Sequence, residues 1–290
     1  MREKGFVNRY WPYLFILVPL LLQIVFFFIP LAQGVIYSFT DWTGLTSSYN
    51  FIGIDNYLAI FSDAKFLSSI GFTLLFTIGL VVGQIVLGIA IALLLNQKIK
   101  GVGLFRTAYF FPAVISTVTL GLIFKQFFNY GLAPLGEFLG IEWLSQSLIA
   151  NEGTAFWGLL FVALWQGVAI PVVIFLANLQ SIPNEIREAA SIDGANRWQT
   201  FKSIELPFLS PAISIVLILA MKAGLTAFDL IYALTGGGPS GSTTSLGLLV
   251  YNYAFKNNQF GYASAIAIVL FIIIAIVSVI QINSSKKFEV

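Results

Sequence analysis

The sequence contains no cysteine and no histidine in its 290 residues. Without cysteine there is no disulfide framework, thiol nucleophile or thiolate metal site, and without histidine the commonest metal ligand and general base are missing. Charged residues make up only 10% of the chain, whereas soluble domains contain about 25%. We therefore expect neither catalysis nor a metal site in this chain. The net charge of +2 is too small to indicate a nucleic-acid partner.

Apolar residues, in contrast, make up 58% of the sequence, and the mean hydropathy is +0.89. Stretches of about 20 apolar residues can cross a bilayer, and six such stretches are present. The predicted spans are residues 13–37, 69–95, 107–128, 154–179, 208–231 and 260–283. The sequence thus predicts an all-α, polytopic membrane helix bundle. Because no linker or soluble segment is evident, we treat residues 1–290 as one membrane domain, and we expect the first span to stay in the mature protein.

Basic residues fall in four groups that all lie on one side of this topology. The groups are Arg2, Lys4 and Arg9; Lys98, Lys100 and Arg106; Arg187, Arg197 and Lys202; and Lys286 and Lys287. Cytoplasmic loops carry an excess of lysine and arginine. We therefore expect a multi-pass protein of the cell membrane, in contact with the lipid bilayer, with both termini in the cytoplasm.

The inner loop 181–207 is a long, charge-rich insert between two apolar spans. Its residues 184–193 contain good helix formers, and Gly194 stands where a left-handed residue would end the helix. Ala189 and Ala190 leave a shallow place on this helix where a partner's backbone could come close. Glu188 and Asp193 flank that place and could bond or pair across an interface. The loop is therefore interpreted as a docking element, and the alternative is an amphipathic helix at the membrane surface without a partner.

The spacing of the loop residues resembles the signature loop of permease subunits in binding-protein-dependent ABC importers. The matching residues are Glu188, Ala189, Ala190, Gly194, Ile204, Leu206 and Pro207. The resemblance implies the type I importer fold, in which this loop is a cytoplasmic coupling helix that docks on an ATPase subunit. Residues 13–19, 38–42, 103–106, 111–112 and 228–239 are similar to carbohydrate-importing permeases, especially the maltose-type first subunit. Unlike the maltose permease, this chain has no extra N-terminal spans and no large outer domain.

This resemblance implies several partners: a second, different permease, a dimer of ATPase subunits and an extracellular or periplasmic substrate-binding protein. The chain contains no phosphate-binding Gly-x-x-x-x-Gly-Lys-Ser/Thr loop and no Gly-Lys pair. We therefore expect no cofactor in this chain, with ATP and Mg²⁺ bound by the partner ATPase. The implied function is import of a sugar or oligosaccharide.

Candidate substrate contacts are polar or aromatic side chains at membrane depth, where an ion costs at least about 2.5–3.5 kcal/mol. The candidates are Gln84, Trp165, Gln166, Lys222 and Asp229. Packing or subunit contact is the alternative for each of them. Lys222 and Asp229 share a helix face but would stand about 10 Å apart along the axis, so they are not a direct pair. Lys222 would then meet a carboxylate on the second permease or an acidic substrate.

A glycine-rich segment after the fifth span is the candidate contact for the binding protein. It consists of Gly236, Gly237, Gly238 and Pro239, and it predicts a mobile outer turn. A plain loop with special backbone angles is the alternative.

Two other classes of function compete with an importer subunit. A secondary active sugar carrier needs its own intramembrane coupling groups, and few charged residues lie within the spans. An intramembrane enzyme needs a nucleophile or metal constellation, and the sequence offers none that is recognisable.

Overall fold

The computed structural model describes residues 6–97 and 101–285, and within these ranges the chain is helical, with no strand. Thr40 and Phe51 form an isolated bridge. The chain divides into two compact units. Unit 1 contains the residues up to Ser62 and Val250–Leu270, and unit 2 contains Asp63–Leu249 and the residues from Phe271 onward. The predicted all-α fold is confirmed, and the assignment of one membrane domain stays a prediction.

Unit 1 is built from an apolar helical segment and a loop folded against the start of the last helix. Its elements are α1 (Phe6–Gln23), the π-helical η1 (Ile24–Phe28), α2 (Ile29–Tyr37), α3 (Asp55–Ser62), the π-helical η6 (Asn252–Lys256) and the first part of α16 (Phe260–Ser285). The Trp42 and Phe260 rings lie 5.3 Å apart, and the Gly261 amide donates to the Trp42 carbonyl over 2.8 Å. Asn50 donates to Asp41 through its backbone and side-chain nitrogens, which lowers the pKa of that carboxyl group.

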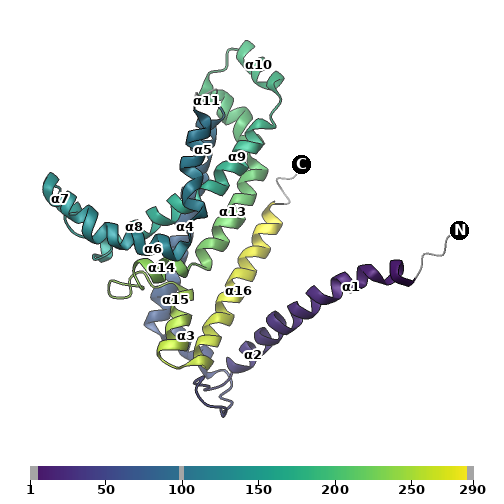
Figure 1. Cartoon of the computed structure of the whole chain (residues 1–290), viewed down its shortest axis with the longest axis vertical. Helices are drawn as coiled ribbons and strands as arrows, with labels where there is room; N and C mark the ends of the chain where they lie inside the picture. Colours follow the sequence, from purple (N-terminus) through teal and green to yellow (C-terminus); the bar gives the residue numbers. More distant parts are fainter. Residues whose placement is uncertain (1–5, 98–100, 286–290) are drawn as a thin grey trace. The chain divides into compact units, whose positions relative to one another are not determined.

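Unit 2 contains the remaining helices (Figure 1). They are α4 (Ala64–Leu95), α5 (Val102–Phe110), η2 (Phe111–Val114), α6 (Thr117–Gln126), η3 (Phe127–Leu132), α7 (Ala133–Leu139), η4 (Glu142–Leu144), α8 (Glu152–Gly167), α9 (Ala169–Gln180), α10 (Asn184–Ile192), α11 (Arg197–Thr200), η5 (Phe201–Glu205), α12 (Leu206–Phe208), α13 (Ser210–Leu225), α14 (Asp229–Leu234) and α15 (Leu246–Tyr251). The helices α4, α9 and α13 pack side by side and form its core.

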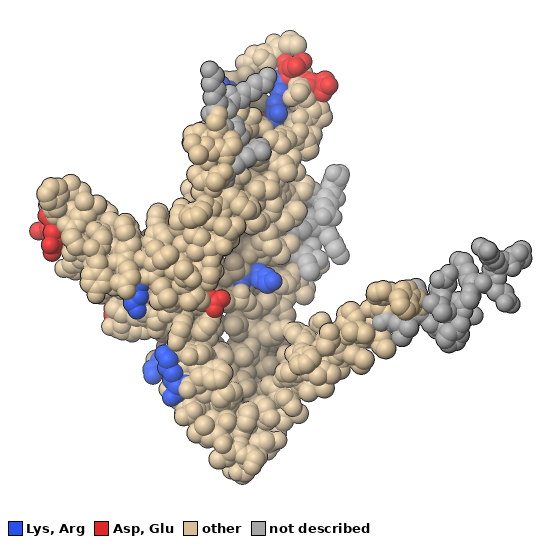
Figure 2. Space-filling view, in the orientation of Figure 1, with Lys and Arg blue, Asp and Glu red and all other residues tan. Residues whose placement is uncertain are grey.

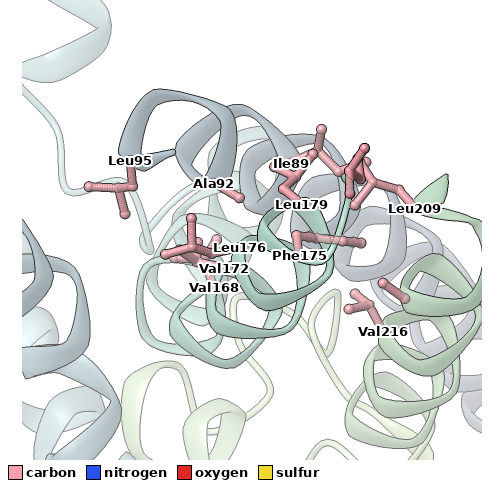
Figure 3. Packing of buried hydrophobic residues seen from close by; sticks show 12 residues of the cluster. Ile89, Ala92, Leu95, Val168, Val172, Phe175, Leu176, Leu179, Leu209 and Val216 are labelled. Carbon is pink, nitrogen blue, oxygen red and sulfur yellow. The ribbon is translucent and has the colours of Figure 1, made fainter. Parts of the chain in front are cut away.

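The core of unit 2 is a cluster of aliphatic side chains around Phe175, which is fully buried (Figure 3). Ile89 and Ala92 come from α4, and Val172 comes from α9. Small residues let these helices approach closely, as is common in lipid. A Cβ on Gly224 would lie 2.6 Å from the Thr77 backbone, so α13 needs a glycine where it meets α4.

Three helices are long and apolar enough to span a membrane without a break: Phe15–Tyr37, Ala64–Leu95 and Phe260–Gln281. Three bent helix pairs pass the same test together: Gly103–Val114 with Thr117–Leu139, Glu152–Gly167 with Ala169–Gln180, and Arg197–Phe208 with Ser210–Leu225. The described residues therefore provide three to six spans. The predicted count of six stays a prediction.

Proline accounts for two of the bends, because it removes an amide donor and frees a carbonyl one turn earlier. Pro171 follows the 48° bend between α8 and α9, and Pro211 follows the 66° bend before α13. Pro112 opens η2, just before the 99° break that precedes α6. Pro112 and Pro171 therefore both lie beside a break in a helix.

One predicted span is wrong at its end. The fifth span was expected to run to residue 231, but α13 ends at Leu225 and α14 begins at Asp229. The Thr226 amide donates to the carbonyls of Lys222 and Gly224, and the chain then turns before re-entering a helix. Because apolar residues continue across this turn, hydropathy alone does not reveal the end of the helix, and the predicted span was too long.

Candidate docking helix and pathway residues

The helix α10 begins after Pro183 and ends in a Schellman motif at Gly194. The Ala195 amide donates to the Ala190 carbonyl over 2.9 Å, and the Gly194 amide donates to the Ser191 carbonyl over 3.2 Å. Gly194 has φ +79°, a left-handed conformation that glycine adopts without strain. The predicted helix and its C-terminal glycine are thus confirmed. The role of α10 in docking stays a prediction.

One face of α10 points to solvent. Glu185, Glu188, Ala189 and Ile192 follow the i, i+3, i+4, i+7 spacing of one helical stripe, and all four are exposed. Ile192 is 87% exposed although it is a large aliphatic residue. In Figure 2, acidic side chains gather at the end of unit 2 that carries α10. We call these four residues the outer stripe.

Only some of the predicted docking residues belong to the outer stripe. Glu188 and Ala189 belong to it, and Asp193 and Gly194 are exposed at the helix end, whereas Ala190 is half-buried. The sequence interpretation missed Glu185 and Ile192, although their helical spacing from Glu188 and Ala189 could have revealed them.

The other half of the loop returns to the core. Asn196 and Gln199 form a capping box that starts α11, and η5 and α12 follow. Ile204 packs against the core cluster, while Leu206 and Pro207 are exposed at α12. The signature spacing therefore joins exposed residues on α10 to a core contact at the base of α13.

The inner face of α10 carries Arg187, which sequence interpretation used only as an orientation signal. Its Nη2 donates to the Leu179 carbonyl over 3.0 Å, and its Nε lies 3.3 Å from Glu205 Oε1. One guanidinium therefore contacts the end of α9 and the segment before α12.

Two glutamines among the pathway candidates lie at the bend between α8 and α9. Gln84 on α4 is 6% exposed, and its amide nitrogen lies close to the backbone of Gly167. Gln166 donates to the Ile115 carbonyl over 3.0 Å and to Thr117 Oγ1 over 3.2 Å. Ile115 lies at the break before α6, and Gln166 lies at the bend between α8 and α9. The side chain of Gln166 therefore connects these two helix breaks.

The other pathway candidates are at least partly exposed. Trp165 packs edge-on against Phe124, with ring centroids 5.3 Å apart. Lys222 and Asp229 are exposed, and no ion pair joins them in the part of the chain that the structure describes. The Phe228 and Tyr232 rings stack 5.5 Å apart beside Asp229, a pair that sequence interpretation missed.

The glycine turn at 236–239 is fixed by hydrogen bonds. Thr243 Oγ1 donates to the Gly238 carbonyl over 2.6 Å, and the Thr243 amide donates to the Gly237 carbonyl over 3.2 Å. Gly237 is buried with φ +91°, and a Cβ there would lie 2.7 Å from Thr244 Oγ1. This bonding favours a rigid turn over the mobile one that the sequence suggested. Contact with a binding protein stays a prediction.

Most of the cations used to assign orientation lie outside the described residues. These are Arg2, Lys4, Lys98, Lys100, Lys286 and Lys287, and the side chains of Arg9 and Arg106 are not described either. Among the described residues, no cluster of three or more acidic ligands could hold a metal ion.

The fold and the exposed helix α10 define a class: an all-helical, multi-pass membrane subunit that presents a charged helix at one end of a helical unit. The family model described as "Binding-protein-dependent transport system inner membrane component" matches residues 84–290. The chain therefore belongs to this family. It is a membrane transport subunit, and its family members are not themselves catalysts.

Two relatives are similar over essentially their whole length. The multiple sugar-binding transport system permease protein MsmF of Streptococcus mutans serotype c is 62% identical over 290 residues and covers 100% of both chains. The probable starch degradation products transport system permease protein AmyD of Thermoanaerobacterium thermosulfurigenes is 36% identical, covering 100% of this chain and 98% of that one.

A solved structure supports the fold. One chain of a bacterial ABC transporter involved in the import of the acidic polysaccharide alginate superposes with a TM-score of 0.83. The match covers 98% of each chain at 19% sequence identity. At that identity the likeness concerns the fold alone.

Proposed function

We propose that this chain is the permease subunit of an ATP-driven importer and forms half of the translocation pathway for a sugar or oligosaccharide. The permeases named for multiple sugars and for starch degradation products, 62% and 36% identical, support the substrate class. The outer stripe of α10 carries the proposal, because it presents the signature residues Glu188 and Ala189 to solvent.

The outer stripe defines the surface that the ATPase must offer. Opposite Glu185 and Glu188 we expect basic residues on the ATPase, and opposite Ile192 we expect an apolar pocket. Ala189 is small enough to let a backbone segment of the ATPase approach closely. Buried apolar anchors surrounded by polar contacts are typical of specific interfaces. ATP and Mg²⁺ would both bind to the ATPase, in keeping with the missing phosphate-binding loop of this chain.

The orientation follows from this docking. With α10 in the cytoplasm, six spans place both termini there, as the basic residues indicate. The turn at 236–239 then lies on the outer side, where a binding protein delivers the sugar. Lys222, Asp229, Trp165, Gln84 and Gln166 line or support the pathway. A second, different permease supplies the other half.

A secondary active sugar carrier is the competing function. Such a carrier requires intramembrane groups that titrate or bind an ion. It does not require an exposed stripe of residues at the signature spacing, because it has no ATPase to bind. Lys222 and Asp229 do not form an ion pair in the described structure. The importer therefore explains more of the observed surface.

A size series at Ala189 tests the docking proposal. The tagged chain is expressed with its transporter partners, and co-purification of the ATPase is measured for Ala189→Ser and Ala189→Arg. We expect serine to keep the ATPase bound, because its side chain is small. Arginine on the exposed stripe should remove it without affecting membrane insertion. Retention of the ATPase by the arginine variant would contradict docking through this face.

A further inference from the structure

Arg187 makes contacts that the docking proposal does not require. Its side chain lies on the inner face of α10, and it is half-buried while the outer stripe is exposed. Its Nη2 donates to the Leu179 carbonyl over 3.0 Å. Its Nε lies 3.3 Å from Glu205 Oε1, in an ion pair. We call Arg187 and Glu205 the brace.

The two contacts lie on different elements. Leu179 is in the last turn of α9, where carbonyls lack helical partners and favour a cation. Glu205 ends η5, and its carbonyl accepts the Leu209 amide over 2.9 Å at the base of α13. One side chain on α10 therefore holds the end of α9 and the approach to α13 at the same time.

The brace is sheltered from water. The Glu205 side chain is 15% exposed and that of Arg187 is 26% exposed, and the Arg187 Nε atom itself is buried. Exposed ion pairs contribute little, because water and salt screen them, but a sheltered pair is screened less. The planar, forked guanidinium can contact two partners at once, which a lysine ammonium on one flexible stem does less well.

The chain segments that flank α10 couple its motion to α9 and α13 less directly than the brace does. On one side the chain passes through Ser181–Pro183, and on the other it passes through the glycine-ended turn at residues 193–196. Such short turns can bend when α10 is displaced. The brace resists that bending, because a displacement of α10 must either move α9 and α13 together or separate Arg187 from its two partners.

We propose that the brace transmits displacement of α10 to α9 and α13 together, so that ATPase motion opens the pathway instead of bending the loop. This inference rests on the proposed function. It separates two properties of α10: the outer stripe determines whether the ATPase binds, and the brace determines how much transport each ATP drives. Arg187 and Glu205 are positioning residues in this scheme.

The test uses the complete transporter in proteoliposomes with its binding protein. ATP hydrolysis and uptake of a radiolabelled sugar bound by that protein are measured together, giving sugar moved per ATP. Arg187→Met removes the charge but keeps much of the apolar stem, and Glu205→Gln removes the opposite charge. Arg197→Met is the matched control, because Arg197 is exposed and makes no ion pair within the described part of the chain.

We expect both brace variants to keep the ATPase bound and to hydrolyse ATP, while sugar moved per ATP falls by about five-fold or more, the range of a typical coupling energy. Arg197→Met should match the wild type. The double variant should be no worse than the poorer single variant, since residues that act as one unit are not additive. Arg187→Lys should fall between the wild type and Arg187→Met.

Unchanged sugar per ATP in Arg187→Met and Glu205→Gln overturns the inference, and so do additive losses in the double variant. If Arg187→Met does not assemble, Glu205→Gln alone decides between these outcomes. Failure of the proposed function gives a different result, namely a wild-type complex that shows no ATP-driven uptake at all.

Discussion

Gly194 shows how one residue sets the backbone path where α10 ends. It has φ +79° and ends α10 through a Schellman motif. A Cβ at this position would meet no atom within 4 Å, so space is not what requires a glycine here. The requirement is conformational, because a left-handed backbone strains residues that carry a Cβ.

Two substitutions at Gly194 separate conformation from size. We expect Gly194→Val to disfavour the native turn by about 1–2 kcal/mol, which corresponds to about a 5–30-fold smaller population of the docking conformation. Gly194→Asn should be milder, because asparagine tolerates the left-handed region. Co-purification of the ATPase measures both. Equal binding by the valine and wild-type chains would contradict the account.

Lys222 is the predicted contact for an acidic substrate or for a carboxylate on the second permease. Replacement by methionine is expected to lower uptake by about five-fold or more, because hydrogen bonds to charged groups contribute about 1.5–3 kcal/mol. Uptake of a neutral and an acidic oligosaccharide is measured in parallel with assembly. A loss confined to the acidic sugar indicates substrate contact, and a joint loss with assembly indicates a carboxylate on the second permease. Unchanged uptake of both, with intact assembly, rejects either role.

At the scale of elements, helix breaks and close helix contacts shape unit 2. Gln166 bonds the freed Ile115 carbonyl, so that the bend between α8 and α9 meets the break before α6. Gly224 lets α13 lie against α4 at Thr77. In lipid, such contacts matter because neighbouring helices gain little from hydrophobic burial.

Glycine substitutions test the packing of α13 on α4. Gly224→Ala places a Cβ 2.6 Å from the Thr77 backbone, and overpacking of this kind costs about 1–3 kcal/mol. Gly71→Ala is the control on α4, since its Cβ would meet nothing within 4 Å. Thermal melting of the purified complex should fall by about 2–4 °C per kcal/mol for Gly224→Ala and stay unchanged for Gly71→Ala. Equal melting temperatures would contradict the packing.

Gln166→Leu tests the bond between the two breaks. The change leaves the half-buried Ile115 carbonyl without its side-chain donor, and a typical intramolecular hydrogen bond contributes about 0.5–1.5 kcal/mol. Gln180→Leu, at the exposed end of α9, is the matched control. Melting should fall for the first variant only, and a similar fall in both would show that the donor at Gln166 has no special role.

Sequence patterns predicted the elements whose signals are local. The helix α10 was predicted because its helix formers and Gly194 are adjacent, and the long apolar helices were predicted from length and hydropathy. The turn after Leu225 was missed, since apolar residues continue through it. The contacts of Arg187 and Gln166 were also out of reach, because they join residues from 8 to 51 positions apart and depend on how the helices pack.

At the scale of the whole molecule, this chain is one subunit of a multi-subunit transport system. The apolar window in its first helical segment buries none of its residues within the chain, a surface suited to lipid or to another membrane subunit. The family places the chain among inner membrane components of transport systems that depend on a binding protein. If the proposed function holds, the energy for transport comes from a separate ATPase subunit and reaches this chain through α10.

The most direct test of this claim is sugar accumulation in sealed proteoliposomes under two conditions. One preparation contains the purified chain alone. The other contains the complete complex, with the binding protein on one side of the membrane and ATP on the side that carries α10. We predict accumulation only in the complete complex, and only while ATP is hydrolysed. Accumulation by the chain alone, driven by an imposed proton or sodium gradient, would contradict the account.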